Sequence, residues 1–298
     1  DLDDLPFPAR HLLPINAYRR MPHEKLKEPC IDMLVSRGCP YNCTYCSIKI
    51  IAGKLRRTRS PRKTIEEMKM LKNKYNVKQI HFQDPVLTIN KKWILEFCDL
   101  LIGANLGLIW SCQTRTDCVD REILIKMKKA GCKSVLYGIE SLDQKSLDNI
   151  KKGTKSEEII KAIVLTKKIG IEARCSIMVG LPGETKNAVN KTVDLLIKAN
   201  PAFAQFHSTV VFPGTDLEND VQKYGRVLNE SSIKKLDLTG KPFVPKDYKD
   251  EEEVIQMQQK AYKRFYMRPK YIIKRVVNPN NFYRNLKGLK IFLNLLKK

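Results

Sequence analysis

Three cysteines in one short segment, Cys39, Cys43 and Cys46, have a C-x3-C-x2-C spacing. Soft thiolates favour iron–sulfur clusters or zinc over hard cations. Clusters that only carry electrons use four cysteine ligands, so a three-ligand cluster has one iron with an open coordination position. The spacing therefore indicates a cluster that binds a small molecule at that iron.

Zinc is the alternative metal for these three thiols. A structural zinc site usually adds a second C-x2-C or an H-x3–5-H pair, and the sequence has neither. Its four histidines, at positions 11, 23, 81 and 207, show no metal-ligand spacing. The iron–sulfur cluster is therefore the favoured interpretation.

The segment 39–46, with Tyr45 just before the last cysteine, resembles the signature of the radical S-adenosylmethionine (radical SAM) enzymes. Segments similar to the later motifs of the family follow in order, at 82–85, 138–141, 180–185 and 213–215. Residues 1–8 resemble the segment that joins a cobalamin-binding domain to the core in the cobalamin-binding subfamily. The resemblance covers 1–215 closely and the remainder loosely.

This resemblance implies a [4Fe-4S] cluster on the three cysteines that chelates S-adenosylmethionine. An electron from a donor such as flavodoxin or ferredoxin would split that molecule into methionine and a 5′-deoxyadenosyl radical. The subfamily usually adds a methyl group or closes a ring with the help of cobalamin. This chain contains no Asp-x-His-x-x-Gly, the cobalamin-ligating motif of such domains. Cobalamin is therefore expected only through a domain that this chain lacks.

The resemblance also implies contacts with S-adenosylmethionine. The aromatic beside the last cysteine is Tyr45, and the strand-ending turn is formed by Gln83, Asp84 and Pro85. Glu140 is the acid expected to bind the ribose, and Gly180 and Gly183 form the glycine turn expected near the adenine. Each has a simpler structural interpretation, because aromatics fill cores, Asp and Pro end strands, buried acids need partners and glycines make tight turns.

Two arginines are further candidates for this site. Arg174 lies in an otherwise apolar strand, where it would hold the carboxylate of S-adenosylmethionine or pair with Glu140 or Glu172. Arg115 ends the third predicted strand and is predicted to face the substrate.

Alternating apolar runs and amphipathic stretches predict an α/β fold with a parallel sheet and external helices. The predicted strands cover 31–36, 78–83, 108–113, 134–139, 172–179 and 203–211, and the predicted helices cover 64–75, 91–102, 121–130, 144–150, 156–169 and 184–199. The family adopts a partial (β/α)6 barrel of the TIM type, which the resemblance implies here. Loops at the carboxyl ends of such strands build the active site.

Three regions are predicted: a strap at 1–30 that leads from a missing N-terminal domain, the radical SAM core at 31–215, and a basic helical region at 216–298. The net charge is +23, and the segment from Val254 to Lys298 carries twelve lysines and arginines and no acid. The sequence has no run of 18 apolar residues and no leader peptide. With nine cysteines and no pairing pattern, a reduced cytoplasm is the expected compartment.

The end of the chain, 284–298, has leucines and a phenylalanine near one helical face and lysines around them. Such a helix lies on an anionic membrane surface or covers the mouth of the barrel, and both interpretations remain open. The segment 264–271 resembles one in relatives of the anaerobic magnesium-protoporphyrin ester cyclase and of lipid-modifying enzymes. A hydrophobic or lipid-like substrate is therefore expected.

Two rival functions remain. An RNA-modifying radical SAM enzyme, such as a tRNA methylthiotransferase, would use the basic residues to bind phosphate. However, the chain lacks the three extra cysteines of those enzymes and a strand pattern for an RNA-binding barrel, so nucleic acid is not the expected partner. The other rival is a non-catalytic iron–sulfur module, which the full set of adenosine-binding motifs disfavours.

Overall fold

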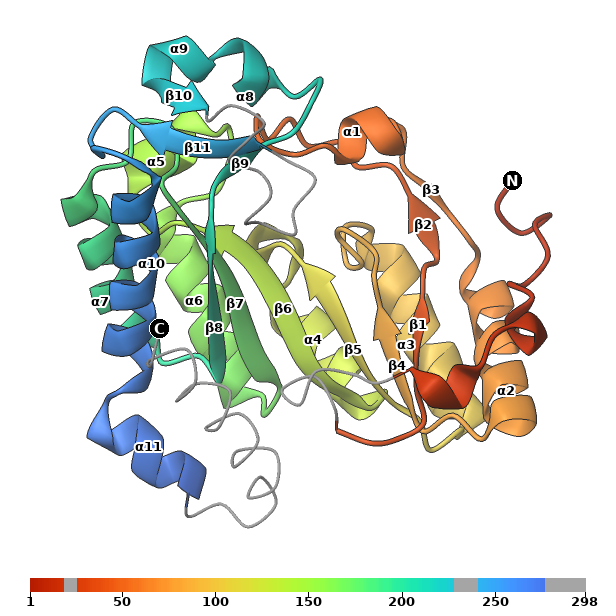
Figure 1. The fold of residues 1–298 in the computed structure, drawn as a ribbon. Helices are drawn as coiled ribbons and strands as arrows, with labels where there is room; N and C mark the ends of the chain where they lie inside the picture. Colours follow the sequence, from red (N-terminus) through yellow and green to blue (C-terminus); the bar gives the residue numbers. More distant parts are fainter. Residues whose placement is uncertain (19–25, 228–240, 277–298) are drawn as a thin grey trace.

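The computed structural model describes residues 1–18, 26–227 and 241–276. Six parallel strands form one curved sheet in the order β1-β4-β5-β6-β7-β8. Their bounds are β1 Cys30–Met33, β4 Gln79–Phe82, β5 Ile109–Thr114, β6 Cys132–Glu140, β7 Glu172–Val179 and β8 Phe203–Ser208. The curvature leaves an open barrel with β1 and β8 at its two edges (Figure 1), as predicted.

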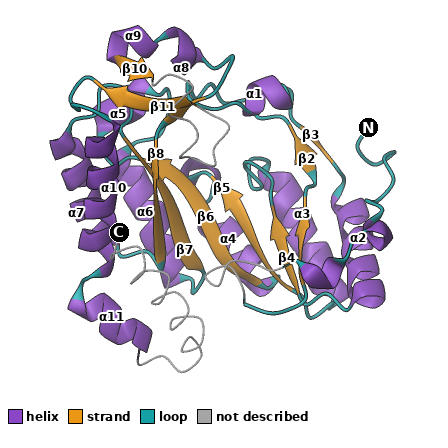
Figure 2. Cartoon of the chain, in the orientation of Figure 1, coloured by secondary structure: helices purple, strands orange, loops and turns teal. Residues whose placement is uncertain are grey.

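Five of the longer helices cover the convex face of the sheet (Figure 2): α2 Pro61–Tyr75, α3 Lys91–Ala104, α4 Arg121–Lys129, α6 Ser156–Lys168 and α7 Lys186–Ala199. The other helices are α1 Ile48–Ile51, α5 Gln144–Asn149, α8 Asp216–Asn219, α9 Val221–Tyr224, α10 Glu251–Tyr266 and α11 Pro269–Val276, and α1, α8 and α9 lie beyond the carboxyl ends of the strands (Figure 1). Within the described ranges, no helix combines the length and the apolar character needed to cross a membrane.

Local sequence signals explain where the main helices begin and end. The side chains of Ser60, Asp120 and Thr185 each accept a hydrogen bond from the backbone N–H three residues later, which satisfies a donor that the first helical turn leaves unpaired. Asn76 and Asn200 end α2 and α7 with positive φ angles of 50° and 51°. Asparagine adopts this left-handed conformation at lower cost than most residues.

Alternation along the strands divides the sheet into two faces. The face toward the helices is apolar and forms one continuous core, for example Phe82, Trp110, Tyr137, Ile177 and Phe206. The alternate residues face the concave side, and most of them are polar: Ser111, Gln113, Ser134, Ser176 and Gln205. The barrel interior is therefore a polar cavity wall and not a packed apolar core.

The first residues lie along α2 as a strap. Asp3 Oδ1 accepts a hydrogen bond from the Ser60 backbone at 2.8 Å, and the Phe7 ring lies under the cations of Arg59 and Lys63. Two 3-10 turns follow, at Arg10–Leu12 and Ile15–Ala17. That 1–30 leads from a further domain stays a prediction.

Two strand predictions need correction. The predicted first strand ends early, and its last residue belongs to a separate hairpin of β2 Ser36–Arg37 and β3 Arg57–Thr58. The predicted sixth strand breaks at Thr209, which donates to the Val179 carbonyl through both its N–H and its hydroxyl. The chain then leaves the main sheet.

The sequence predicts a helical region after the core, but the described part of this region also contains strands. Three short antiparallel strands, β9 Val210–Val211, β10 Gly225–Val227 and β11 Lys241–Pro245, form a small sheet near the carboxyl ends of β7 and β8 (Figure 1). The long helix α10 packs against β8 and α7. The amphipathic helix predicted at 284–298 lies outside the described residues.

Candidate cofactor site

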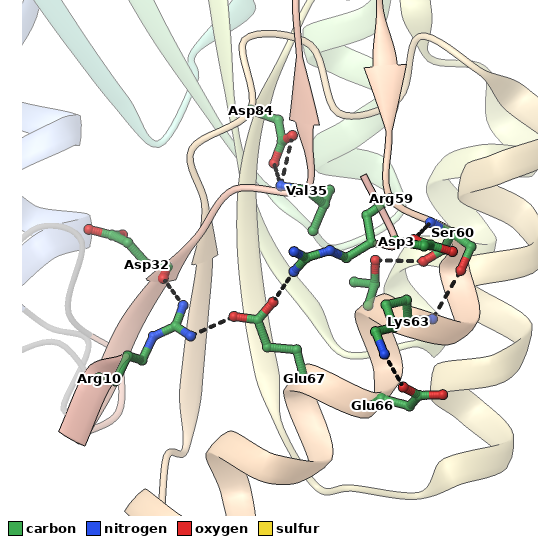
Figure 3. Close-up of polar contacts among 11 residues, drawn as sticks. Asp3, Arg10, Asp32, Val35, Arg59, Ser60, Lys63, Glu66, Glu67 and Asp84 are labelled. Atoms are coloured by element: carbon green, nitrogen blue, oxygen red, sulfur yellow. Dashed lines mark hydrogen bonds and ion pairs between the residues drawn. The ribbon is translucent and has the colours of Figure 1, made fainter. Parts of the chain in front are cut away.

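The three predicted cluster ligands lie on the loop between β2 and α1, above the carboxyl ends of the barrel strands. The base of this loop is tied to the sheet because the Asp84 carboxylate accepts hydrogen bonds from Ser36 Oγ and from the Val35 backbone at 3.2 Å, the latter drawn in Figure 3. Its far end is tied at Thr44, which bonds to the Ile150 carbonyl and the Leu217 N–H. The loop therefore spans the rim.

All nine cysteines are free thiols, and Cys39 and Cys43 are 7% exposed. Burial raises the pKa of the Cys43 thiol, while the cations of Lys152 and Arg115 oppose that rise. Among the described residues, no three His, Cys, Asp or Glu side chains converge closely enough to hold a single metal ion. In a four-iron cluster each thiolate binds a different iron, so the three ligands need no common centre.

Arg115 lies against the cluster loop, a position that the sequence does not predict. Its Nη1 donates toward Cys43 Sγ at 3.8 Å, and its guanidinium stacks on the Tyr41 ring at 3.7 Å. Asp117 holds the same guanidinium through two bonds of 2.9 and 2.8 Å, and the Lys152 carbonyl accepts a third of 2.6 Å. The structure therefore places Arg115 around the cluster ligands, while the prediction had placed it against substrate.

Glu140, at the end of β6, lies beside Tyr45 of the cluster loop. Glu140 Oε1 accepts hydrogen bonds from the Tyr45 hydroxyl at 2.8 Å and from Lys152 Nζ at 2.9 Å. The strand register shifts between Gly138 and Glu140, and Glu140 has a positive φ of 60°. A Cβ at Gly138 would stand 2.7 Å from Glu140 Oε1, so only glycine leaves room for this arrangement.

The three residues after β4 have different environments. Gln83 is exposed on the concave side and bonds to Asp32 and Gln113. The Asp84 side chain is fully buried and turned toward the base of the cluster loop. Pro85 follows at the rim, half-buried. Of the three side chains, Gln83 is therefore the one directed into the barrel.

Gly180 and Gly183 form the turn between β7 and α7, with φ angles of 81° and 69°. Glu184, buried, closes this turn: its Oε2 accepts from the backbone of Gly180 at 2.8 Å and of Leu181 at 3.2 Å. A Cβ at Gly183 would stand 2.7 Å from Asn149 Nδ2. The two glycines therefore allow close packing of this turn against Asn149 and Glu184.

Arg174 is not brought to this rim. It is the third residue of β7, buried, with its guanidinium 4.9 Å from the centre of the Phe203 ring. Gly180 lies six residues further along, or ~20 Å at the rise of a strand. The expected contact between Arg174 and the carboxylate of S-adenosylmethionine therefore has no support from its position, nor does a pair with Glu140.

Sequence reasoning missed Lys152 entirely. It lies in Lys151-Lys152-Gly153, a run that is typical of a solvated loop, yet Lys152 is 5% exposed and bonds to Glu140. The turn at Lys151, with a positive φ of 51°, directs the next side chain inward. No pattern in the sequence distinguishes this lysine from its exposed neighbour.

The donor set fits an iron–sulfur cluster: three thiols on one loop, two of them buried, with cations of Arg115 and Lys152 beside them. An open parallel barrel with such a loop at the carboxyl ends of its strands defines a class of enzymes that bind a small cofactor in the barrel mouth.

Comparison with known families identifies this class. The profile of the radical SAM superfamily matches residues 33–196, and the chain belongs to that superfamily, whose members use a [4Fe-4S] cluster and S-adenosylmethionine. An uncharacterized methyltransferase of Pyrococcus horikoshii is 31% identical over 97% of this chain and 62% of its own length. The anaerobic magnesium-protoporphyrin IX monomethyl ester cyclase of Rubrivivax gelatinosus is 30% identical over 80% of this chain and 42% of its own.

Among solved structures, the cobalamin-dependent S-adenosylmethionine radical enzyme OxsB, with aqua-cobalamin and S-adenosylmethionine bound, is similar with a TM-score of 0.63. Its identity is 16%, over 88% of this chain and 45% of that one. This likeness supports the fold. The chain spans about half the length of these relatives, so the activity of a whole protein does not transfer to it directly.

Proposed function

We propose that this chain is the catalytic core of a radical SAM enzyme that methylates a carbon atom or closes a ring. The observation that carries the proposal is the loop of Cys39, Cys43 and Cys46, tied across the barrel rim beside Glu140 and Tyr45. The three cysteines would hold the cluster that binds S-adenosylmethionine, and this pair would supply a 5′-deoxyadenosyl radical able to remove a hydrogen atom from a C–H bond of the substrate.

Each residue has a separate task in this proposal. The three thiolates hold the cluster, and Arg115 and Lys152 offset part of their charge. Both hydrogen bonds that Glu140 accepts from other described side chains fall on Oε1, which leaves Oε2 available for ribose hydroxyls. Gln83 offers its amide to the methionine part from the concave side.

The concave wall bears on the class of substrate. Gln113, Ser176 and Gln205 present neutral hydrogen-bonding groups toward the cavity, and a bound molecule that left them unpaired would bind poorly. The substrate is therefore one with hydrogen-bonding groups along its edge, even if its body is as apolar as expected from residues 264–271.

Cobalamin does not fit residues of this chain. Its ligating motif, Asp-x-His-x-x-Gly, is absent from residues 1–298, so a cobalamin would have to be held by a further domain. Contact with a membrane surface rests on 284–298, outside the described residues, and stays a prediction. Cosedimentation of the chain with anionic vesicles, with and without 284–298, tests it.

The proposed activity is tested with anaerobically reconstituted protein and a chemical reductant, titanium(III) citrate. We expect wild type to release 5′-deoxyadenosine and methionine, and Cys43→Ala to release neither and to bind less iron. Cys98→Ala removes a buried thiol on α3 and serves as the matched control, which should keep both properties. Undiminished 5′-deoxyadenosine from Cys43→Ala would refute the assignment of the ligands.

A further inference from the structure

The outer side of the cluster loop carries two strongly exposed aliphatic side chains, Ile51 at 78% and Leu55 at 76%. This segment lies directly on the cluster ligands. The Gly53 carbonyl accepts a hydrogen bond from the Cys39 N–H at 3.1 Å, and a Cβ at Gly38 would stand 2.2 Å from the Leu55 carbonyl oxygen. Solvent at Leu55 is therefore separated from the Cys39 backbone by one layer of chain.

The segment that contains this loop carries charges of one sign only. Residues 33–65 contain eight lysines and arginines and no aspartate or glutamate. Some of these cations are paired within the chain, namely Lys49 with Asp216, Arg59 with Glu67 and Lys63 with Glu66.

Three other cations of this segment, Arg37, Lys54 and Arg57, are exposed. Within the part of the chain that the structure describes, none of the three forms an ion pair with an acid. We call Arg37, Ile51, Lys54, Leu55 and Arg57 the cluster-loop patch. It combines two exposed aliphatic side chains with three exposed cations that form no ion pair among the described residues.

We propose that the cluster-loop patch binds an acidic protein that carries one electron and delivers it to the cluster. This inference rests on the proposed function, which requires one electron for each molecule of S-adenosylmethionine split. In the transfer the carrier is oxidised by one electron and the cluster is reduced by one, and no bond is formed or broken.

Charge and position together select this partner. An exposed apolar patch with a polar rim is typical of protein interaction sites, and a cationic rim steers an acidic partner into contact. A nucleic-acid site would also be expected to offer aromatic side chains for stacking, and the patch has none. An electron carrier gains from lying one chain layer from Cys39, because its electron then has a short path to the cluster.

The test compares two electron sources in the double variant Lys54→Glu/Arg57→Glu. With an acidic flavodoxin and its reductase, we expect the rate of 5′-deoxyadenosine formation to fall at least tenfold, through a higher KM for flavodoxin. With titanium(III) citrate, which needs no docking site, the rate should stay within twofold of wild type. Lys92→Glu/Lys129→Glu makes the same charge change on exposed positions of α3 and α4 and should leave both rates unchanged.

The outcomes separate this proposal from the proposed function. No 5′-deoxyadenosine from wild type with titanium(III) citrate contradicts the function itself. The docking site is overturned if Lys54→Glu/Arg57→Glu has normal rates with both titanium(III) citrate and flavodoxin. It is also overturned if the control variant loses as much of its flavodoxin-driven rate as Lys54→Glu/Arg57→Glu does. Binding of flavodoxin, transfer RNA and anionic vesicles to wild type and variant is measured in parallel. A patch that binds RNA or vesicles but not flavodoxin overturns the proposal even if no turnover occurs.

Discussion

The buried Glu67 carboxylate on α2 supports the base of the cluster hairpin through two ion pairs. It accepts hydrogen bonds from Arg10 Nη1 at 2.5 Å and Arg59 Nη1 at 2.6 Å, and its side chain is 2% exposed (Figure 3). Arg10 belongs to the strap, and Arg59 follows β3. One carboxylate therefore joins the strap, α2 and the returning strand of the cluster hairpin.

Replacing Glu67 with Gln keeps the shape but leaves two buried guanidinium groups without a counter-charge. Breaking a buried pair in this way costs about 3–5 kcal/mol. For a chain of 298 residues, the entropy of unfolding is about 0.6 kcal/mol/K. A loss near the middle of that range lowers the melting temperature by about 6 °C.

The assay is thermal unfolding followed by circular dichroism, with all variants reconstituted and handled without oxygen. Glu66→Gln is the control, because Glu66 is the next residue, is 58% exposed and pairs with Lys63 at 3.3 Å. A surface pair of this kind contributes at most about 1 kcal/mol, or about 2 °C. If Glu67→Gln shifts the melting temperature no more than Glu66→Gln does, the central role of Glu67 is refuted.

Three further predictions concern the site itself. Burial raises the pKa of Glu184 from 4.5 to about 7, so its stabilising contribution is complete below about pH 4.5 and is lost as pH rises through 7. Unfolding experiments at pH 5 and 8 should therefore show the stability of wild type relative to Glu184→Gln falling by roughly 2–3 kcal/mol, and an unchanged difference would refute it. Arg115→Met removes a donor to Cys43 Sγ and should make the reduction potential of the cluster more negative, because hydrogen bonds to the sulfurs help to set that potential. A redox titration followed by electron paramagnetic resonance checks this, with Arg121→Met, exposed on α4, as the control that should not move. Gly138→Ala places a Cβ 2.7 Å from Glu140 Oε1 and should weaken binding of S-adenosylmethionine at least tenfold while iron content is kept; Gly103→Ala, with open space around it, should bind normally, and equal binding by both variants would contradict the role of Glu140.

Much of the barrel follows from the sequence because hydrophobic periodicity reports which face of an element is buried. The fifth predicted strand, 172–179, agrees with β7 at both ends, and the predicted start of α4 agrees with the Asp120 cap. Periodicity does not report which sheet a strand joins. Val210 and Val211 therefore looked like the end of β8, although they pair with Pro242 and Lys241 of β11.

The site was predictable only where a residue type is rare or its spacing is specific. Three cysteines at fixed spacing identify their own loop, and a glutamate at the end of a buried strand calls for a partner. That partner, Lys152, comes from a loop whose composition is ordinary. Likewise, the Asp84 side chain points to the cluster loop and not into the cavity because it bonds to Ser36 of the hairpin that folds over it. That contact is tertiary information, which the local sequence does not carry.

The charges around the cluster loop divide into two groups. The two cations beside Cys43 are each held by an acid of this chain, Arg115 by Asp117 at 2.8 Å and Lys152 by Glu140 at 2.9 Å, so each pair has no net charge. Orientation therefore matters for their effect on the thiolates, and Arg115 directs its Nη1 at Cys43 Sγ at 3.8 Å. The exposed cations of the cluster-loop patch form no ion pair with an acid among the described residues, and Arg37 lies opposite Arg57 in the β2–β3 pair, where like charges cost stability. That cost is understandable if the patch is selected for an acidic partner, and removing it by Lys54→Glu/Arg57→Glu should therefore leave stability unchanged or improved while reduction by the partner is lost.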